Sequence, residues 1–328
     1  MNGEITFSQA IREAMSEEMR QDPNVFLMGE DVGVFGGVFG VSAGMLDEFG
    51  AERVRDTPIS EAAIVGAGLG AALMGMRPIV EIMFADFVTV AMDQIVNQVA
   101  KARYMTGGKA DVPLTIRLVN GAPGSAAAQH SQSPEAWFMN VPGLKIAIPA
   151  TPSDAKGLLK SAIRGQDPVL FFEHKMLYGS TGPAPEEEDV TPFGQAAIRR
   201  AGDDATIIAI GGMLPVALDA AQQLEQKGVS AEVIDPRTLV PLDVDALVAS
   251  VAKTHRAIIV HEAHRRAGPG AEIAAILAEK AIGSLDAPIL RVATKNAPFP
   301  YNPDLEQFIL PTVSDVVEAV EAVVNYRL

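Results

Sequence analysis

Short apolar segments alternate with helical segments along almost the whole chain, and this alternation limits the possible fold more than any other feature. In the first half, strands are expected at residues 25–28, 78–83 and 113–119, and helices at residues 5–20, 64–76 and 87–104. Strands that alternate with helices in this way form a parallel sheet covered by helices. The sequence therefore predicts an α/β protein.

The alternation is interrupted over residues 178–192, which contain three prolines and a run of acidic residues. Prolines and clustered like charges are typical of linkers. Strand and helix patterns resume beyond this stretch, and a chain of 328 residues is long enough for two domains. We expect one domain over residues 1–185, a linker over 186–200 and a smaller α/β domain over 201–328.

Composition excludes several classes of function. The chain has 26 Lys and Arg against 41 Asp and Glu, a formal charge of −15, which argues against nucleic-acid binding. It has no cysteine, which removes disulfides, thiolate metal sites and Cys nucleophiles. The longest uncharged apolar run, residues 62–76, is shorter than the roughly 20 residues that a membrane span needs. With no signal-peptide pattern, we expect a cytoplasmic protein that does not enter a membrane.

Two motifs resemble known ligand sites only superficially. Residues 66–71 fit the dinucleotide fingerprint, but the glycines lie inside an expected helix rather than at its start, where a pyrophosphate would bind. A nicotinamide-dependent dehydrogenase is therefore the weaker alternative. His261 and His264 are one residue too close for the helical zinc motif, so we interpret residues 261–264 as a polar turn at a strand end.

Glu61 and His130 are the strongest catalytic candidates. Glu61 begins a helix that is otherwise apolar, where an acidic residue can simply stabilise the helix dipole. A carboxyl group held there against an apolar core can also share a proton with a ring nitrogen. His130 follows a loop rich in Gly and Ala, and a loop histidine can be an acid–base group near neutral pH or a hydrogen-bonding anchor.

Six segments together carry a family resemblance. They are residues 28–32, 56–61, 86–95, 129–132, 142–145 and 154–158. In order and spacing they resemble the β subunit of the thiamin-diphosphate-dependent E1 component of 2-oxo acid dehydrogenase complexes. Residues 126–132 and 173–178 are most similar to the acetoin dehydrogenase branch, with the pyruvate and branched-chain 2-oxo acid enzymes as near neighbours.

The resemblance implies a transketolase-like fold, in which a pyrimidine-binding domain, a parallel sheet with helices on both faces, precedes a smaller α/β transketolase C-terminal domain. It implies that Glu61 binds N1′ of the aminopyrimidine of thiamin diphosphate and that Phe87 stacks on that ring. His130 corresponds to a residue near the reactive centre, where it handles protons or assists acyl transfer. The other matching cofactor-binding positions are Glu30, Ile59 and Met83.

Part of such a site is missing from this sequence. Enzymes of this kind hold the diphosphate through Mg²⁺ with a Gly-Asp-Gly motif, and the nearest approach here, residues 202–204, lacks the last glycine. The resemblance therefore implies an E1 α subunit that supplies the diphosphate and Mg²⁺ half, in an α2β2 heterotetramer. Some relatives also bind K⁺ through backbone carbonyls, at positions that correspond to Leu114, Ala162 and Asp167.

The implied reaction is oxidative cleavage of acetoin, or decarboxylation of pyruvate or a branched-chain 2-oxo acid, with acyl transfer to the lipoyl domain of an E2 acyltransferase. The sequence leaves the substrate and the role of His130 open. It also leaves the alternative of a non-catalytic subunit that stabilises α and binds E2. The sequence does not indicate a chemical role for the glycine-rich stretch from Gly33 to Gly44.

Overall fold

The computed structural model describes residues 3–186 and 188–327, and the chain divides into two units. One unit consists of Met1–Asn120 and Trp137–Phe193, and the other of Gly121–Ala136 and Gly194–Leu328. The segment 121–136 thus belongs structurally to the C-terminal unit, which the sequence did not indicate. Within the described residues, no helix combines the length and the apolar character that crossing a bilayer requires.

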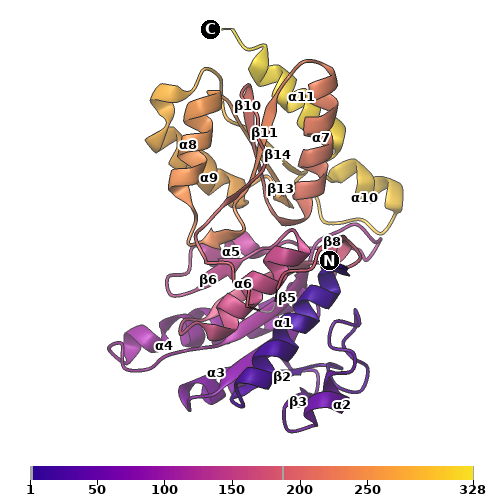
Figure 1. The fold of residues 1–328 in the computed structure, drawn as a ribbon, viewed down its shortest axis with the longest axis vertical. Helices are drawn as coiled ribbons and strands as arrows, with labels where there is room; N and C mark the ends of the chain where they lie inside the picture. Colours follow the sequence, from indigo (N-terminus) through magenta and orange to yellow (C-terminus); the bar gives the residue numbers. More distant parts are fainter. Residues whose placement is uncertain (1–2, 187, 328) are drawn as a thin grey trace. The chain divides into compact units, whose positions relative to one another are not determined.

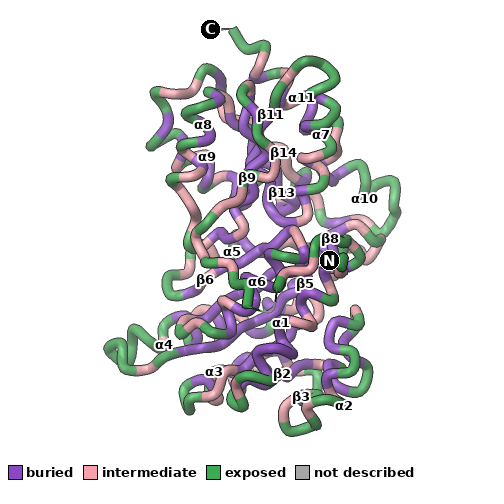
Figure 2. The backbone as a smooth tube through the Cα atoms, viewed as in Figure 1, coloured by how far each residue is buried: buried purple, intermediate pink, exposed green. Residues whose placement is uncertain are grey.

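The main sheet of the first unit is parallel, with adjacent strands in the order β6-β7-β5-β4-β2-β3. These strands are β2 (Val25–Gly29), β3 (Val54–Asp56), β4 (Arg77–Ile82), β5 (Thr115–Asn120), β6 (Lys145–Ala147) and β7 (Val169–His174). A separate antiparallel pair joins β1 (Glu4–Thr6) and β8 (Thr181–Pro183). Strands β2, β5 and β7 are buried along their whole length (Figure 2), as expected of a parallel sheet covered on both faces.

The helices of this part of the chain are α1 (Phe7–Gln21), α2 (Met45–Phe49), α3 (Glu61–Leu73), α4 (Ala100–Met105), α5 (Glu135–Met139) and α6 (Pro152–Arg164), with a short 3₁₀ turn at Lys175–Leu177. The helices expected over 5–20 and 64–76 form, as α1 and α3, whereas the short helices α2 and α5 were not expected. The single helix expected over 87–104 is instead divided into a 3₁₀ segment η1 (Ala85–Ala91), a π-helical segment η2 (Gln94–Val99) and α4. Segments of this kind often mark functional regions.

Helices α1 and α6 pack side by side (Figure 1) through a ladder of opposite charges. Glu17 pairs with Lys156 at 2.7 Å and with Lys160 at 2.8 Å, and Lys160 has no exposed surface. Glu18 pairs with Arg164 at 2.7 Å. Burial alone would lower the pKa of Lys156, but hydrogen bonds to the carboxylates around it raise that pKa above its usual value.

A second buried charge cluster joins three neighbouring strands. Arg117 on β5 has no exposed surface and donates to both carboxylate oxygens of Glu173 on β7, at 2.6 and 2.7 Å. It also pairs with Glu81 on β4. Tyr178 donates to Glu173 at 2.8 Å. Because every member is buried and hydrogen-bonded, the cluster fixes the register of β4 against β5. Met83 directly follows β4, so its position depends on this register.

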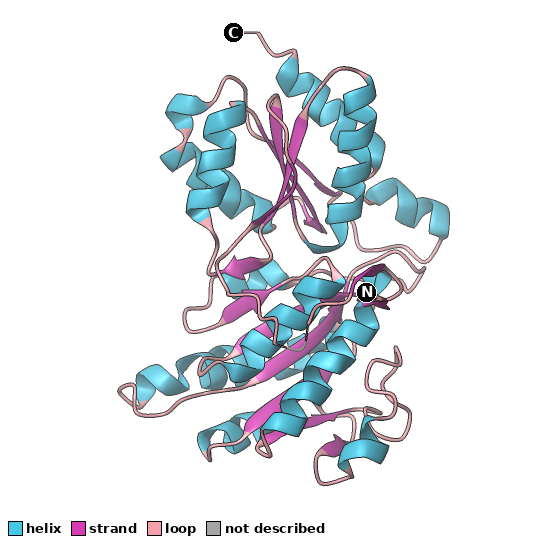
Figure 3. Cartoon of the chain, viewed as in Figure 1, coloured by secondary structure: helices cyan, strands magenta, loops and turns pink. Residues whose placement is uncertain are grey.

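The second unit has a five-stranded sheet in the order β14-β13-β10-β11-β9, parallel except for the pairing of β9 with β11. Its strands are β9 (Ala197–Arg200), β10 (Ala205–Ala209), β11 (Ala231–Asp235), β13 (Ala257–His264) and β14 (Leu290–Thr294). A short strand, β12 (Thr238–Val240), is not part of this sheet. Its helices are α7 (Leu214–Gln226), α8 (Val244–Thr254), α9 (Pro269–Lys280), α10 (Pro303–Ile309) and α11 (Val313–Val324), with 3₁₀ turns at Gly211–Met213 and Ile282–Ser284. Helices α7 and α11 cover one face of the sheet and α8 and α9 the other (Figures 1 and 3).

Candidate functional site

Three of the predicted residues follow neighbouring strands of the first sheet. Glu30 directly follows β2, Ile59 lies three residues after β3, and Met83 directly follows β4. Strands β3, β2 and β4 are adjacent and parallel, so their carboxyl ends share one edge of the sheet. Open α/β sheets bind their ligands at such an edge. The side chain of Ile59 is 83 % exposed there, which leaves an apolar group available for contact.

Glu61 is the first residue of α3 and is only 7 % exposed. Burial and then the negative charge of Glu61 raise the pKa of Glu30 above its ordinary value. Glu30 therefore keeps its proton to a higher pH than an isolated glutamate does. Together with the nearly buried Glu61, it gives this edge of the sheet carboxyl groups that can hydrogen-bond to a basic ring nitrogen.

Phe87 lies in η1, is half-buried and belongs to a series of aromatic rings in contact. The ring of Phe84 contacts it edge to face at 5.8 Å, and Phe39 contacts Phe84 at 5.5 Å. Phe39 also contacts Tyr178 at 5.5 Å. The chain of rings connects Phe87 to the buried charge cluster and fixes it as an apolar surface of defined orientation.

The glycine-rich stretch also packs at this edge, which the sequence did not reveal. Asp56, at the end of β3, accepts hydrogen bonds from the backbone N–H groups of Gly33 at 2.6 Å and Val34 at 3.1 Å. Ser42 donates to the carbonyl of Val32 at 2.7 Å. One sequence signal could have predicted this contact. Asp56 is a carboxylate at the end of an expected strand, and a glycine-rich loop exposes backbone N–H groups that a carboxylate can bind.

His130 lies in the 121–136 segment and is half-buried. This segment belongs to the second unit, so the structure does not place His130 in the same unit as Glu61. Two carboxylates bind backbone N–H groups of the 121–136 segment. Ala122 donates to Glu262 at 2.6 Å, and Ser125 donates to Glu306 at 3.0 Å. Neither glutamate was a sequence candidate.

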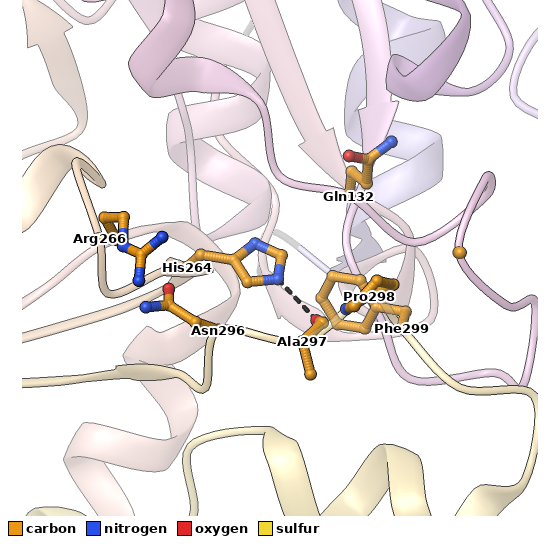
Figure 4. A pocket seen from close by; sticks show the side chains of 8 residues that line it. Gln132, His264, Arg266, Asn296, Ala297, Pro298 and Phe299 are labelled. Atoms are coloured by element: carbon orange, nitrogen blue, oxygen red, sulfur yellow. Dashed lines mark hydrogen bonds between the residues drawn. The ribbon is translucent and has the colours of Figure 1, made fainter.

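A pocket of about 300 Å³ in the second unit adjoins the same segment (Figure 4). Gln132 lines it from the segment, and His264, Arg266 and Phe299 line it from the rest of the unit. His264 Nε2 donates to the carbonyl of Ala297 at 2.8 Å, because a carbonyl oxygen can only accept. The ring edge of His264 also contacts Phe299, at a centroid distance of 5.6 Å.

The superficial motifs have structural explanations. Residues 66–71 lie within α3, and a Cβ atom on Gly68 would come within 2.9 Å of Val80 on β4. Their small side chains therefore serve close packing of helix on sheet and do not form a pyrophosphate turn. The prediction of a polar turn at 261–264 is wrong: these residues belong to β13, which continues through His264, and His261 has no exposed surface.

The acidic side chains of residues 202–204 and of Asp167 have contacts within the protein. Asp203, the central residue of the incomplete motif, is 85% exposed and lies 4.0 Å from the Lys253 ammonium group. Asp204 accepts the backbone N–H of Ser230 at 2.7 Å, and a Cβ atom on Gly202 would lie 2.2 Å from the carbonyl carbon of Ala231, so residues 202–204 form a close turn. Asp167 pairs with Arg103 at 2.8 Å and Lys145 at 2.9 Å. Across residues 3–186 and 188–327, no group of three or more acidic, His or Cys side chains could hold a metal ion.

Two family models and a solved structure match most of the chain. Residues 3–181 match the family model "Transketolase, pyrimidine binding domain", and residues 194–316 match "Transketolase, C-terminal domain". A solved structure described as a split-gene transketolase, inactive β4 tetramer, has the same fold, with a TM-score of 0.82 at 23% identity over 98% of both chains.

Several curated relatives are much more similar in sequence. The acetoin:2,6-dichlorophenolindophenol oxidoreductase β subunit of Bacillus subtilis is 49% identical over 95% of each chain. The pyruvate dehydrogenase E1 β subunit of Rhizobium meliloti is 47% identical over 97% of this chain and 70% of that protein. The 2-oxoisovalerate dehydrogenase β subunit of Bacillus subtilis is 45% identical over 98% of this chain and 99% of that protein. Because these likenesses run through both units, the chain belongs to the transketolase-like family of E1 β subunits of acetoin and 2-oxo acid dehydrogenases.

Proposed function

We propose that the chain is the β subunit of a thiamin-diphosphate-dependent E1 enzyme that cleaves acetoin oxidatively, or decarboxylates a 2-oxo acid, and passes the acyl group to a lipoyl-bearing E2 acyltransferase. The observation that carries the proposal is the position of two carboxyl groups: Glu61 is nearly buried at the first residue of α3, and Glu30 directly follows β2 at the carboxyl edge of the first sheet. Relatives named as an acetoin oxidoreductase, a pyruvate dehydrogenase and a 2-oxoisovalerate dehydrogenase are similarly close in sequence, so acetoin, pyruvate and 2-oxoisovalerate form the substrate panel.

The residues at this edge suit the aminopyrimidine of thiamin diphosphate. When bound, this cofactor supplies a thiazolium carbon for addition to a carbonyl and a ring that accepts the electrons released on C–C cleavage. Glu61 would hold a proton at N1′ of the aminopyrimidine, and Glu30 would supply a second carboxyl group at the same edge of the sheet. Phe87 would offer the ring its apolar face. Ile59 and Met83 would exclude water around it.

The diphosphate half of the site would come from an E1 α subunit. Residues 202–204 lack the last glycine of a Gly-Asp-Gly motif, so we expect Mg²⁺ to be held mainly by α in an α2β2 heterotetramer. A K⁺ ion remains part of the proposal, bound through backbone oxygens near Leu114, Ala162 and Asp167. The carbonyls of Leu114 and Ala162 accept hydrogen bonds from Val169 at 2.9 Å and Gly165 at 3.2 Å, and each keeps a second lone pair.

His130 would act after cofactor binding, as a proton carrier or in acyl transfer to the lipoyl group, because an imidazole exchanges protons near neutral pH. The alternative of a non-catalytic assembly subunit gives Glu61 and His130 no chemical task. A nicotinamide-dependent dehydrogenase has no observation in its favour, since its only motif lies inside α3. The proposed compartment is the cytoplasm.

The substitution Glu61→Gln tests the proposal in the complex with α. Loss of the acidic proton should lower turnover by roughly 10²–10⁴-fold, with the melting temperature of the complex unchanged. Glu52→Gln is the matched control, because the Glu52 side chain is 94% exposed and lies in the same unit. Turnover of Glu61→Gln equal to that of wild type would remove the catalytic role and favour the assembly subunit.

A further inference from the structure

Two buried glutamates of the C-terminal unit make their hydrogen bonds to the loop that carries His130. Glu262 on β13 is 5 % exposed and Glu306 on α10 is 2 % exposed. Both lie far along the chain from the loop, and neither belongs to the cofactor edge of the first unit. A carboxylate loses hydration when it is buried, so its burial needs specific compensation from donors.

The loop provides these donors on both sides of His130. Glu306 Oε2 accepts the backbone N–H groups of Gly124 and Ser125, each at 3.0 Å, and Oε1 accepts that of Ser125 at 3.2 Å. Glu262 Oε1 accepts the N–H of Ala122 at 2.6 Å and the hydroxyl of Ser133 at 3.4 Å. Hydrogen bonds to an ionised acceptor are stronger than neutral ones, so the carboxylates hold the loop at residues 122–125 and again at 133.

The backbone of the loop needs such support. Ser125 has φ 52° and Ala127 has φ 62°, in the left-handed region that residues with a side chain avoid. Conformations of this kind persist only where the surroundings impose them. Glu306 accepts the backbone N–H of Ser125, one of these two residues. Three residues before Ser125, Ala122 is fully buried in an apolar cluster with Phe299, Ile309 and Leu310.

We propose that Glu262 and Glu306 are positioning residues that fix the conformation of the His130 loop, residues 121–136, for the reaction. Glu262 and Glu306 would thereby contribute to turnover through the loop, without a role in binding the cofactor themselves. The catalytic part of this inference rests on the proposed function of His130, whereas the anchoring of the loop stands on the hydrogen bonds alone.

The test compares Glu306→Ala and Glu306→Gln with wild type in the complete αβ enzyme loaded with thiamin diphosphate and Mg²⁺. Loss of hydrogen bonds to a charged acceptor should speed amide exchange of the 121–136 peptide by about 10-fold or more. The value of kcat should fall by at least about 10-fold with the substrate of the panel that wild type uses. The apparent KM for thiamin diphosphate should stay unchanged, because the predicted cofactor residues of this chain lie in the first unit.

Glu306→Gln should recover part of both losses, because an amide oxygen still accepts one N–H group. Asp304→Asn is the control: it removes one charge from the same helix at an exposed residue that does not contact the loop. Glu262→Gln removes the charge of the second glutamate that binds the loop. Measured in the same way, it should also speed amide exchange of residues 121–136.

Three results would overturn the proposal. Unchanged exchange of 121–136 in Glu306→Ala would show that the carboxylate does not hold the loop. Faster exchange with unchanged kcat would show that the loop conformation does not matter for turnover. Faster exchange throughout the chain together with a lower melting temperature would reduce Glu306 to a general stabilising role. Full activity of His130→Ala would instead contradict the proposed function, and the exchange result would still decide the anchoring.

Discussion

Burial decides how single side chains in this protein behave, and sequence patterns show burial only in part. The first-turn position of Glu61 and the loop position of His130 are visible in the sequence, so both could be predicted as candidates. Glu262 and Glu306 could not, because their donors lie more than a hundred residues away along the chain. A carboxylate that binds a distant loop has the same local pattern as one facing solvent.

His261 provides a prediction at this scale. Burial lowers its pKa to about 4, from an ordinary value of 6.5. The unfolded chain therefore binds the proton more readily than the folded chain between these two values. The stability that His261 contributes is fully present above pH 6.5 and declines as the pH falls, by about 3 kcal/mol once pH 4 is reached.

Urea unfolding of wild type and His261→Gln at pH 7.5 and pH 4.5 measures this pH-dependent contribution to the free energy of unfolding. The free energy of unfolding should fall less in the variant than in wild type between the two pH values. His255→Asn is the control, because His255 is exposed and has a positive φ that Asn tolerates. An identical pH dependence in wild type and His261→Gln would contradict the prediction.

Helices and strands were predicted best where their apolar pattern is local. Helix α1 and strands β2 and β4 match the expected segments to within about two residues at each end. The division of 87–104 into 3₁₀, π and α segments was missed, because a helical period of apolar residues does not distinguish these hydrogen-bond patterns. The buried face of α1 was also unexpected, since it carries the carboxylates of Glu17 and Glu18, which pair with basic side chains of α6.

The ladder between α1 and α6 makes Glu17 the most sensitive residue of this helix pair. Glu17→Gln removes the carboxylate shared by Lys156 and Lys160 and leaves Lys160 buried, with Glu18 at 3.9 Å. Breaking a buried ion pair from one side costs roughly 3 kcal/mol. Urea unfolding at neutral pH measures the loss.

Glu13→Gln supplies the comparison for this measurement. Glu13 pairs with the same Lys156 at 3.0 Å, but its side chain is 43% exposed, so its loss should cost under about 1 kcal/mol. Equal destabilisation by the two substitutions would show that burial of the ladder adds nothing.

The whole molecule follows the predicted plan of two α/β units. Alternation of strands and helices indicated both sheets, and the family resemblance indicated their order. The sequence could not show that residues 121–136 leave the first unit for the second, because chain connectivity gives no sign of which core a loop joins. The predicted site residues accordingly fall into two groups, with Glu30, Ile59, Glu61, Met83 and Phe87 in one unit and His130 in the other.

A cofactor site completed by a second chain has a direct thermodynamic consequence. Calorimetric titration of thiamin diphosphate with Mg²⁺ into this chain alone should give no measurable heat of binding, because the chain would offer only the pyrimidine half of the site. The same titration into a mixture with the α subunit should show saturable binding. Tight binding by the chain alone would mean that it holds a diphosphate site of its own.

The path of residues 121–136 also limits how proteins of this kind can be recombined. The chain passes between the units three times, at residues 120–121, 136–137 and 193–194, so its C-terminal half is not a self-contained module. A fragment that starts at residue 194 would retain Glu262 and Glu306 but lack the N–H groups they bind. A chimera of two relatives joined at that point would pair the anchors of one parent with the loop of the other. Residues 121–136 and the C-terminal half should therefore be inherited together.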